Sequence, residues 1–293
     1  MTAPSRIDND LTLVIPTLGR DMLRRTLASV RAAAVRPARV VVVDQGRKPE
    51  IAALAQELTA SGLETLYIPS TSCGRSAGLN VGIAQVETRF VAITDDDCLV
   101  APDWTARLAD RLRRHASAIV TGRVDEGDGE VQLSVVTSAV EEIQHRPRLR
   151  FDRLSGGNMG MPLEVARRVG PFAEHPSMRT AEDAEFAYRA LRLGVPIVYA
   201  PEVVVQHVGW RDLEQREEQY RSYGLSQGGF FGRYLRQGDA FMALRVVVHL
   251  LRASRRWLVG ALRGDADVAR NGKAYVTGLL PGLRAGWRGG RAL

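Results

Sequence analysis

The sequence contains very little cysteine: Cys73 and Cys98 are the only two among 293 residues. Two isolated cysteines exclude a disulfide framework and a thiolate zinc site, so we expect a reducing, cytosolic location. Residues 1–10 lack the apolar stretch of a signal peptide, and no repeat or low-complexity segment occurs. The apolar segment at residues 241–262 is interrupted by four arginines and a histidine, so it is not expected to span a bilayer.

Acidic residues are scarce in the last 80 residues, where 14 Lys and Arg stand against 6 Asp and Glu. The first 213 residues carry 26 basic and 27 acidic residues, so the net charge of +7 comes entirely from the tail. A basic tail can bind nucleic acid or an anionic membrane surface. Nucleic acid is not expected as a partner, because base-stacking aromatic side chains are not interleaved with the basic ones.

The tail at residues 214–293 has a helical pattern, and its central segment carries an arginine stripe opposite an apolar stripe. The arginines are Arg245, Arg252, Arg256 and Arg263, and the apolar residues are Val247, Leu250, Leu258 and Ala261. Such a helix can lie in a membrane interface, or it can pack its apolar face on its own domain and leave the arginines in water. The sequence leaves both interpretations open.

Between residues 11 and 124, apolar strand-like runs alternate with segments of helical periodicity. Strands are expected at residues 11–16, 39–44, 64–69, 90–94 and 118–124, and helices at 21–34, 49–60, 74–86 and 102–115. Continuous apolar runs separated by helices predict a mostly parallel sheet covered on both faces, which is a nucleotide-binding α/β layout. No glycine-rich fingerprint follows the first strand, so a dinucleotide-binding fold is not expected.

Regular structure weakens at residues 125–153, which we expect to be an excursion over one end of the sheet. A helix is expected again at residues 181–193, followed by two strands at 196–200 and 203–207.

Three consecutive carboxylates, Asp95, Asp96 and Asp97, follow the apolar run at residues 90–93. Confining like charges at the end of a buried strand costs free energy unless a cation or hydrogen-bond donors offset the repulsion. Open α/β sheets bind ligands at the carboxyl ends of their strands, and a hard divalent ion takes its ligands from carboxylates, phosphates and water. The run therefore predicts a metal–phosphate site, with an acidic surface turn as the alternative.

Other polar residues also lie where an expected strand ends or a helix begins. Asp44 ends the second strand and can accept from a base or ribose, or cap a turn. Arg75 and Asn80 are polar groups in an otherwise small, apolar helix and are candidate phosphate or nucleobase contacts. Gly157 and Asn158 follow Gly156, and such a glycine pair lets the backbone lie against a ligand or make a tight turn.

Glu182 and Asp183 open the expected helix that follows Thr180. A carboxylate there can be a general base at a cleft, while Thr180 with an acidic residue three positions on is also the pattern of a helix capping box. His207 ends an apolar strand, where it is either a ligand or a satisfied structural histidine.

Taken in order, these segments resemble the family 2 glycosyltransferases of GT-A fold. The motifs are Pro16-Thr17, Asp44, Arg75 with Asn80, the aspartate run followed by Pro102-Asp103-Trp104, Gly157-Asn158-Met159, Glu182-Asp183 and His207. The resemblance covers residues 11 to about 211. It implies an α/β catalytic domain at residues 1–213, with a nucleotide-binding half at 11–124, an acceptor-binding half at 125–213 and a basic helical extension at 214–293.

The resemblance implies inverting transfer of a sugar from a nucleotide-diphosphate donor, a UDP- or dTDP-sugar, to an acceptor hydroxyl. Asp183 would be the general base, and Asp97 with His207 would hold Mn²⁺ or Mg²⁺ on the diphosphate. The nucleotide would contact Thr17, Asp44, Arg75, Asn80, Asp95 and Asp96, and the donor or acceptor sugar would contact Gly157, Asn158, Glu182 and Trp210. The implied role is polysaccharide or glycolipid synthesis on a saccharide or lipid-linked acceptor, at the cytoplasmic face of a membrane.

Two features depart from the family pattern. Asp44 is followed by Gln45 where a second acidic residue is frequent, and Cys98 stands where a further acidic residue is frequent. A soft thiol is a poor ligand for Mg²⁺, so Cys98 is not expected to bind the metal. The alternatives are a sugar-1-phosphate nucleotidyltransferase, for which the loop after the first strand has too few glycines and arginines, and a non-catalytic sugar-nucleotide-binding scaffold.

Overall fold

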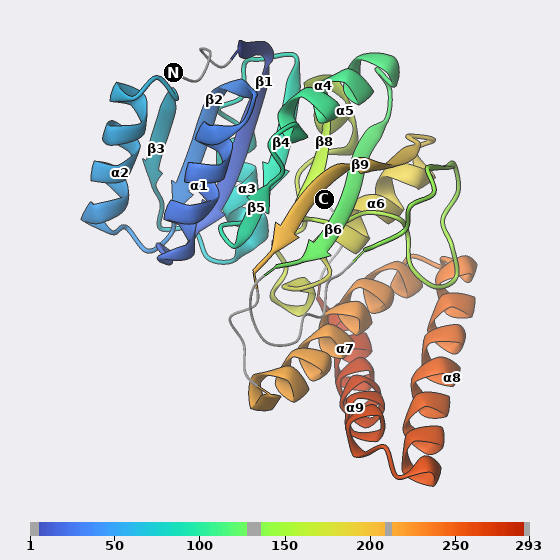
Figure 1. Cartoon of the computed structure of the whole chain (residues 1–293). Helices are drawn as coiled ribbons and strands as arrows, with labels where there is room; N and C mark the ends of the chain where they lie inside the picture. The colour runs from blue at the N-terminus through green and yellow to red at the C-terminus, as the bar shows by residue number, and fades with distance from the viewer. Residues whose placement is uncertain (1–5, 128–135, 209–212, 290–293) are drawn as a thin grey trace. The chain divides into compact units, whose positions relative to one another are not determined.

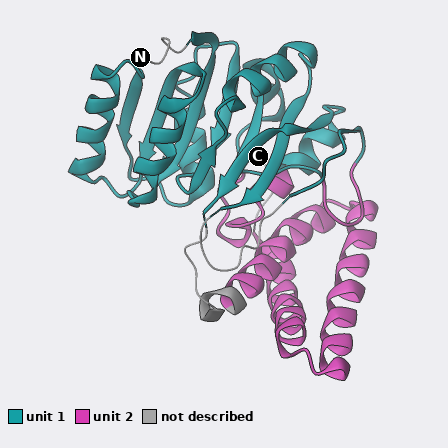
Figure 2. Cartoon of the chain, in the orientation of Figure 1, with its two compact units in different colours: residues 1–146, 153–172, 186–210 teal, residues 147–152, 173–185, 211–293 magenta. Residues whose placement is uncertain are grey.

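The computed structural model describes residues 6–127, 136–208 and 213–289, without the side chains of 213–217. The chain forms two compact units that alternate along the sequence (Figure 2). Unit 1 consists of Met1–Arg146, Arg153–Phe172 and Phe186–Trp210, and unit 2 of Pro147–Asp152, Ala173–Glu185 and Arg211–Leu293. The functional division at residue 213 that the sequence suggests stays a prediction.

Unit 1 is built on a sheet whose strands run in the order β3-β2-β1-β4-β8-β6-β9-β5 (Figure 1). Strand β7 pairs with β9. The strands are β1 (Arg6–Thr17), β2 (Val35–Asp44), β3 (Thr65–Pro69), β4 (Phe90–Thr94), β5 (Cys98–Val100), β6 (Ile119–Glu126), β7 (Glu142–Gln144), β8 (Asn158–Pro162) and β9 (Ile197–His207). The helices are α1 (Met22–Ala32), α2 (Pro49–Ala60), α3 (Arg75–Ile83), α4 (Trp104–Arg114), α5 (Leu163–Val169) and α6 (Glu182–Arg192), whose first turn belongs to unit 2.

The α/β fold is confirmed, and parallel pairing is concentrated in the first half of the sheet. Strands β3, β2, β1 and β4 are parallel, as are β6 and β9, whereas β8, β5 and β7 pair antiparallel with their neighbours. The sequence does not indicate β8, because Asn-Met-Gly-Met-Pro contains no β-branched residue. The two short strands expected near the end of the domain are one strand, β9, and its pairing with β6 shifts register at Gly122.

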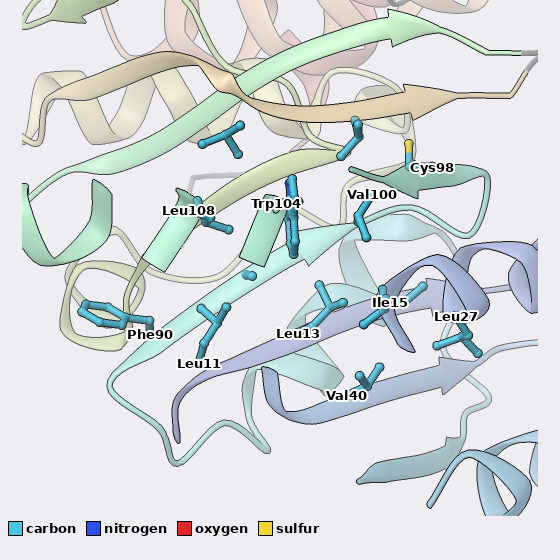
Figure 3. Packing of buried hydrophobic residues seen from close by; sticks show 14 of the residues in the cluster. Leu11, Leu13, Ile15, Leu27, Val40, Phe90, Cys98, Val100, Trp104 and Leu108 are labelled. Carbon is cyan, nitrogen blue, oxygen red and sulfur yellow. The ribbon is translucent and has the colours of Figure 1, made fainter. Parts of the chain in front are cut away.

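Apolar side chains form two cores, one on each face of the sheet. Successive strand residues point to opposite faces, so Leu13 of β1 belongs to one core and Val14 to the other. Helices α1, α2 and α4 contribute to the first core, and α3, α5 and the unit 1 part of α6 to the second. Trp104 is fully buried in the first core (Figure 3), and its indole Nε1 donates to Asn158 Oδ1 at 2.8 Å. Helix α4 therefore covers the sheet and also fixes the first residue of β8.

Unit 2 contains three long helices, α7 (Leu213–Arg236), α8 (Ala240–Arg263) and α9 (Ala266–Arg288), which confirms the helical tail. Asp239 and Asp265 cap α8 and α9 by accepting from the backbone N–H groups of Met242 and Val268. Gly264 ends α8 in the left-handed conformation at φ 73°. Within the part of the chain that the structure describes, no helix is both long and apolar enough to cross a bilayer.

Helices α7 and α9 run in the same direction and touch backbone to backbone through glycines. The glycines are Gly224, Gly228 and Gly232 on α7 and Gly278, Gly282 and Gly286 on α9. A Cβ atom at Gly282 would lie 2.1 Å from the carbonyl oxygen of Leu225, and one at Gly228 would lie 2.2 Å from that of Leu279. Backbone atoms cannot move aside as a flexible side chain can, so the spacing of the two helices depends on these glycines.

Replacing Gly282 by alanine should therefore destabilise unit 2 by about 1–3 kcal/mol, although alanine is the better helix former by about 1 kcal/mol. Urea unfolding of Gly282→Ala measures this. The control is Lys273→Ala, on the exposed side of the same helix, which should change stability by less than about 0.5 kcal/mol. A Gly282→Ala protein as stable as the wild type would contradict the close contact.

A buried polar cluster joins α8 to the segment Pro147–Asp152 within unit 2. Arg245, only 2% exposed, pairs with Asp152 at 2.9 Å, so it does not belong to a solvated arginine stripe. His249 Nε2 lies 2.7 Å from the carbonyl oxygen of Arg150, and Nδ1 lies 2.7 Å from the hydroxyl of Tyr275. Because a carbonyl only accepts, Nε2 carries the proton and Nδ1 accepts from Tyr275. Burial, with the positive charges of Arg245 and Arg252, lowers the pKa of His249 to about 4.

This pKa makes the stability of the protein depend on pH. Between about pH 6.5 and pH 4 the unfolded chain binds a proton at His249 that the folded chain does not, so stability falls as the pH falls. At pH 5 the loss from this group is about 2 kcal/mol. In urea unfolding at pH 7.5 and 5.0, His249→Gln should lose less stability than the wild type. The exposed control, His145→Gln, should lose as much as the wild type, and equal losses in all three proteins would refute a buried neutral His249.

Candidate active site at the carboxyl end of the sheet

The aspartate run lies in the turn between β4 and β5, at the edge of the sheet where β1 also ends. Strand β5 pairs antiparallel with the end of β9, and this pairing places Cys98 opposite His207. The three carboxylates have different partners, and these partners come from segments far apart in the sequence. The site is therefore assembled by the topology of the sheet.

Asp95 is held by Arg75, the first residue of α3. Arg75 Nε donates to Asp95 Oδ1 at 2.7 Å, and Nη2 donates to the carbonyl oxygen of Gly156 at 2.8 Å. At Gly157 a Cβ atom would lie 2.8 Å from Asp95 Oδ2, so a larger residue there would displace this carboxylate. Arg75 thus ties Asp95 to the loop before β8, and a contact of either residue with the nucleotide stays a prediction.

Asp96 joins the ends of β1 and β4. Its Oδ2 accepts from the hydroxyl of Thr17 at 2.6 Å, and its Oδ1 accepts from Arg20 Nη1 at 3.0 Å. Burial, with the negative charges of Asp97 and Asp95, raises the pKa of Asp96, while the hydrogen bond from Thr17 and the charge of Arg20 lower it. Both oxygens therefore have protein partners, and Asp96 organises the site around them.

Asp97 faces the imidazole of His207. Asp97 Oδ1 lies 3.6 Å from His207 Nε2, too long for a hydrogen bond but suited to two ligands of one cation. The second ring nitrogen, Nδ1, is buried and makes no hydrogen bond to any residue that the structure describes. A histidine with a purely structural role would have hydrogen-bond partners for its buried ring nitrogens, and His207 Nδ1 has none among the described residues. Ligand atoms of Asp97, Cys98 and His207 all lie within 4.8 Å of one another.

The donor set fits a divalent cation held by oxygen and nitrogen. Burial, with the charges of Asp95 and Asp97, raises the pKa of the Cys98 thiol well above its usual value. A soft thiol is also a poor ligand for Mg²⁺, which leaves the Asp97 carboxylate and the His207 imidazole. Carboxylate suits Mg²⁺ and Mn²⁺ alike, whereas imidazole favours the transition metal.

Asp44 is fully buried at the end of β2. Its carboxylate accepts from the backbone N–H of Gly46 at 2.9 Å and of Lys48 at 2.7 Å, and from the hydroxyl of Tyr67 at 3.2 Å. Burial and the adjacent Asp44 charge also raise the pKa of Tyr67. Asp44 therefore shapes the turn before α2, and a nucleobase contact through this carboxylate stays a prediction.

Two asparagines proposed as ligand contacts make internal hydrogen bonds. The Asn80 amide donates to the carbonyl oxygen of Phe172 at 2.9 Å and accepts from its N–H at 2.8 Å. Asn158 is fully buried, and besides accepting from Trp104 it donates to the carbonyl oxygens of Arg123 and Val203. Both asparagines therefore fix neighbouring segments, and a contact of either one with the nucleotide or a sugar stays a prediction. Trp210, proposed as a sugar contact, lies outside the described residues.

Glu182 and Asp183 lie in unit 2, in the first turn of α6. Asp183 Oδ1 accepts from the backbone N–H of Ala184 at 2.7 Å, and Glu182 is 5% exposed. The helix begins at Glu182, two residues after Thr180, whose hydroxyl donates to the carbonyl oxygen of Ser222 at 3.4 Å. A carboxylate in the first turn is stabilised by the N–H groups and the dipole of the helix.

Arg20 belongs to the site, although the sequence pattern does not indicate it. Its Nη1 lies 3.0 Å from Asp96 and 3.6 Å from Asp97, and its side chain is 36% exposed. The only signal was its position, four residues after the expected first strand, among several other arginines.

The family model of glycosyl transferase family 2 matches residues 12–167, a little over half of the chain. This chain belongs to glycosyl transferase family 2. Curated relatives include a pre-mycofactocin glycosyltransferase of Mycobacterium tuberculosis, 27% identical over 207 residues, which are 68% of this chain and 42% of the relative. Glycosyltransferase GlyA of Streptococcus pneumoniae is 23% identical over 117 residues, 40% of this chain and 17% of the relative. The chain thus spans less than half the length of these curated relatives.

Solved structures share the fold. A mannosyltransferase of Pyrobaculum calidifontis, solved with GDP-Man and Mn²⁺, has a TM-score of 0.62 and 16% identity, covering 97% of this chain and 88% of that one. TarS of S. aureus, residues 1–349, solved with UDP-GlcNAc, has a TM-score of 0.57 and 16% identity, with 92% of each chain covered. At this identity the likeness shows the GT-A fold and does not identify a donor.

The position of Arg20 leads to a prediction about metal affinity. Its guanidinium repels a cation placed at Asp97, and a unit charge acting over about 6 Å in a water-like dielectric contributes about 0.7 kcal/mol, or about threefold. Arg20→Gln should therefore bind Mn²⁺ about threefold more tightly without nucleotide, measured from the free-ion signal by electron paramagnetic resonance. The control is Arg24→Gln, whose side chain is 63% exposed, and it should not change the affinity. Unchanged or weaker binding in Arg20→Gln would be the contrary result.

Proposed function

We propose that the chain is an inverting glycosyltransferase that moves a sugar from a UDP- or dTDP-sugar to an acceptor hydroxyl. The observation that supports this most is the juxtaposition of Asp97 and His207 at the carboxyl end of the sheet, in a member of family 2. Family membership favours transfer over nucleotidyl transfer or a scaffold role. Synthesis of a polysaccharide or glycolipid, with a saccharide or lipid-linked acceptor, is part of the same proposal.

Asp97 and His207 would hold the divalent ion, with Mn²⁺ preferred because one donor is an imidazole nitrogen. When bound, the ion neutralises the negative charge that grows on the departing diphosphate. The neighbouring residues orient the other two carboxylates: Thr17 and Arg20 hold Asp96, and Arg75 holds Asp95. These contacts keep the adjacent carboxylates from turning toward the ion, so that one carboxylate is presented to it in a fixed orientation.

Asp183 would be the general base. A hydroxyl group is a weak nucleophile until a positioned base takes its proton, and a carboxylate at the start of α6 has the chemistry to do so. Attack on the anomeric carbon from the side opposite the leaving diphosphate would invert its configuration. Glu182 and Trp210 would contact the sugars, and Asp44, Asp95 and Thr17 would lie beside the nucleotide.

Asp183→Asn should lower the rate of transfer by at least about 10²-fold, because the amide cannot accept the proton, while nucleotide affinity stays within about twofold. Transfer and hydrolysis are followed with labelled UDP- and dTDP-sugars, and nucleotide binding by calorimetry. Asp103→Asn is the control, since this aspartate is half-exposed at the start of α4 and pairs with Arg107. Full turnover in Asp183→Asn would remove Asp183 as the base.

A further inference from the structure

We propose that an exposed apolar face of α8 binds the surface of an anionic lipid bilayer. This face, the α8 stripe, consists of side chains between 50% and 87% exposed: Leu244, Val247, Leu251, Leu258 and Leu262. Their spacing of 3, 4, 7 and 4 residues keeps them on one side of a helix. The outward face of a surface helix is ordinarily polar, and here it is apolar.

The opposite face of α8 already serves the packing of unit 2. Met242, Val246, His249, Ala253 and Gly260 are buried there. The residues of α8 that pack on the rest of unit 2 are therefore not those of the α8 stripe. The α8 stripe is left in contact with solvent.

The charges around the stripe identify what would cover it. No acidic residue occurs between Ala240 and Arg263, whereas four exposed arginines do: Arg252, Arg255, Arg256 and Arg263. Guanidinium groups bind phosphate oxygens in pairs of hydrogen bonds, and apolar side chains between them can enter the acyl boundary. A second copy of the chain fits less well, because a second α8 carries no acidic residue that could pair with these arginines.

The geometry favours a helix that lies along the membrane. Leu244 and Leu262 are 18 residues apart, which corresponds to about 27 Å along a helix. The apolar side chains lie on one side of the helix along this length, and the exposed arginines lie from Arg252 to Arg263, so the helix would lie in the interface plane with one face buried. The membrane proposal does not depend on the proposed transfer reaction. Its consequence would be that unit 2 holds the protein at a surface where lipid-linked acceptors occur.

The test is flotation of the full chain with vesicles of phosphatidylcholine alone or with 30% phosphatidylglycerol, in low salt. We expect binding to anionic vesicles at least tenfold stronger than to neutral ones, and weaker binding in 0.5 M NaCl. The double variant Leu251→Asn with Leu258→Asn should lose at least tenfold in binding. The control is Leu280→Asn, the same change at a residue of α9 that is 54% exposed, and it should bind as the wild type does.

Absence of binding to anionic vesicles at low salt would overturn the proposal, as would equal losses in the double variant and in Leu280→Asn. Size-exclusion chromatography tests the remaining outcome. If the wild type is a dimer, the double variant is a monomer and neither binds vesicles, the α8 stripe binds a second copy of the chain and not a lipid surface. Melting curves establish that each variant is folded. Should the double variant not fold, Arg255→Gln with Arg263→Gln takes its place, and undiminished binding in that variant would also overturn the proposal.

Discussion

Repulsion between three adjacent carboxylates is the constraint around which the site is built. Asp95, Asp96 and Asp97 follow one another where β4 ends, and two of them are almost fully buried. Arg75 pairs with Asp95, and Arg20 and the Thr17 hydroxyl pair with Asp96. Asp97 lies 3.6 Å both from Arg20 Nη1 and from the His207 imidazole. This division makes a charged turn tolerable and leaves one carboxylate with the geometry of a metal ligand.

The sheet brings these partners together because of its mixed topology. Parallel strands β1 and β4 end at the same edge, which places Thr17 near the aspartate run. Strand β8 runs the other way and begins at that edge, so its preceding glycines lie beside Asp95. The short antiparallel pair of β5 and β9 then places His207 opposite Cys98. Asn158, buried among three elements, fixes the point where these strands meet.

The features that could be predicted from the sequence are those set by residues close to one another along the chain. The sequence predicts the aspartate run, the first four strands and the helical tail, because hydrophobic periodicity and charge spacing involve only neighbouring residues. The internal hydrogen bonds of Asn80 and Asn158 could not be predicted, because their partners Phe172, Arg123 and Val203 are tens of residues away, and a ligand contact of either asparagine stays a prediction. The role of Arg20 also depends on a partner far away in the sequence, and β8 lacks the β-branched residues that mark a strand. For α8 the two faces are both partly apolar, and only packing decides which is buried.

The central claim is that Asp97 and His207 share a divalent ion while Asp95 and Asp96 are occupied by the protein. Anomalous diffraction from crystals grown with Mn²⁺ and UDP tests it most directly, because the ion is located independently of any activity. The account predicts one strong peak bonded to the Asp97 carboxylate and the His207 imidazole, with the Cys98 sulfur outside its ligand sphere. A peak held instead by Asp95 or Asp96, or no peak at this edge of the sheet, would contradict it.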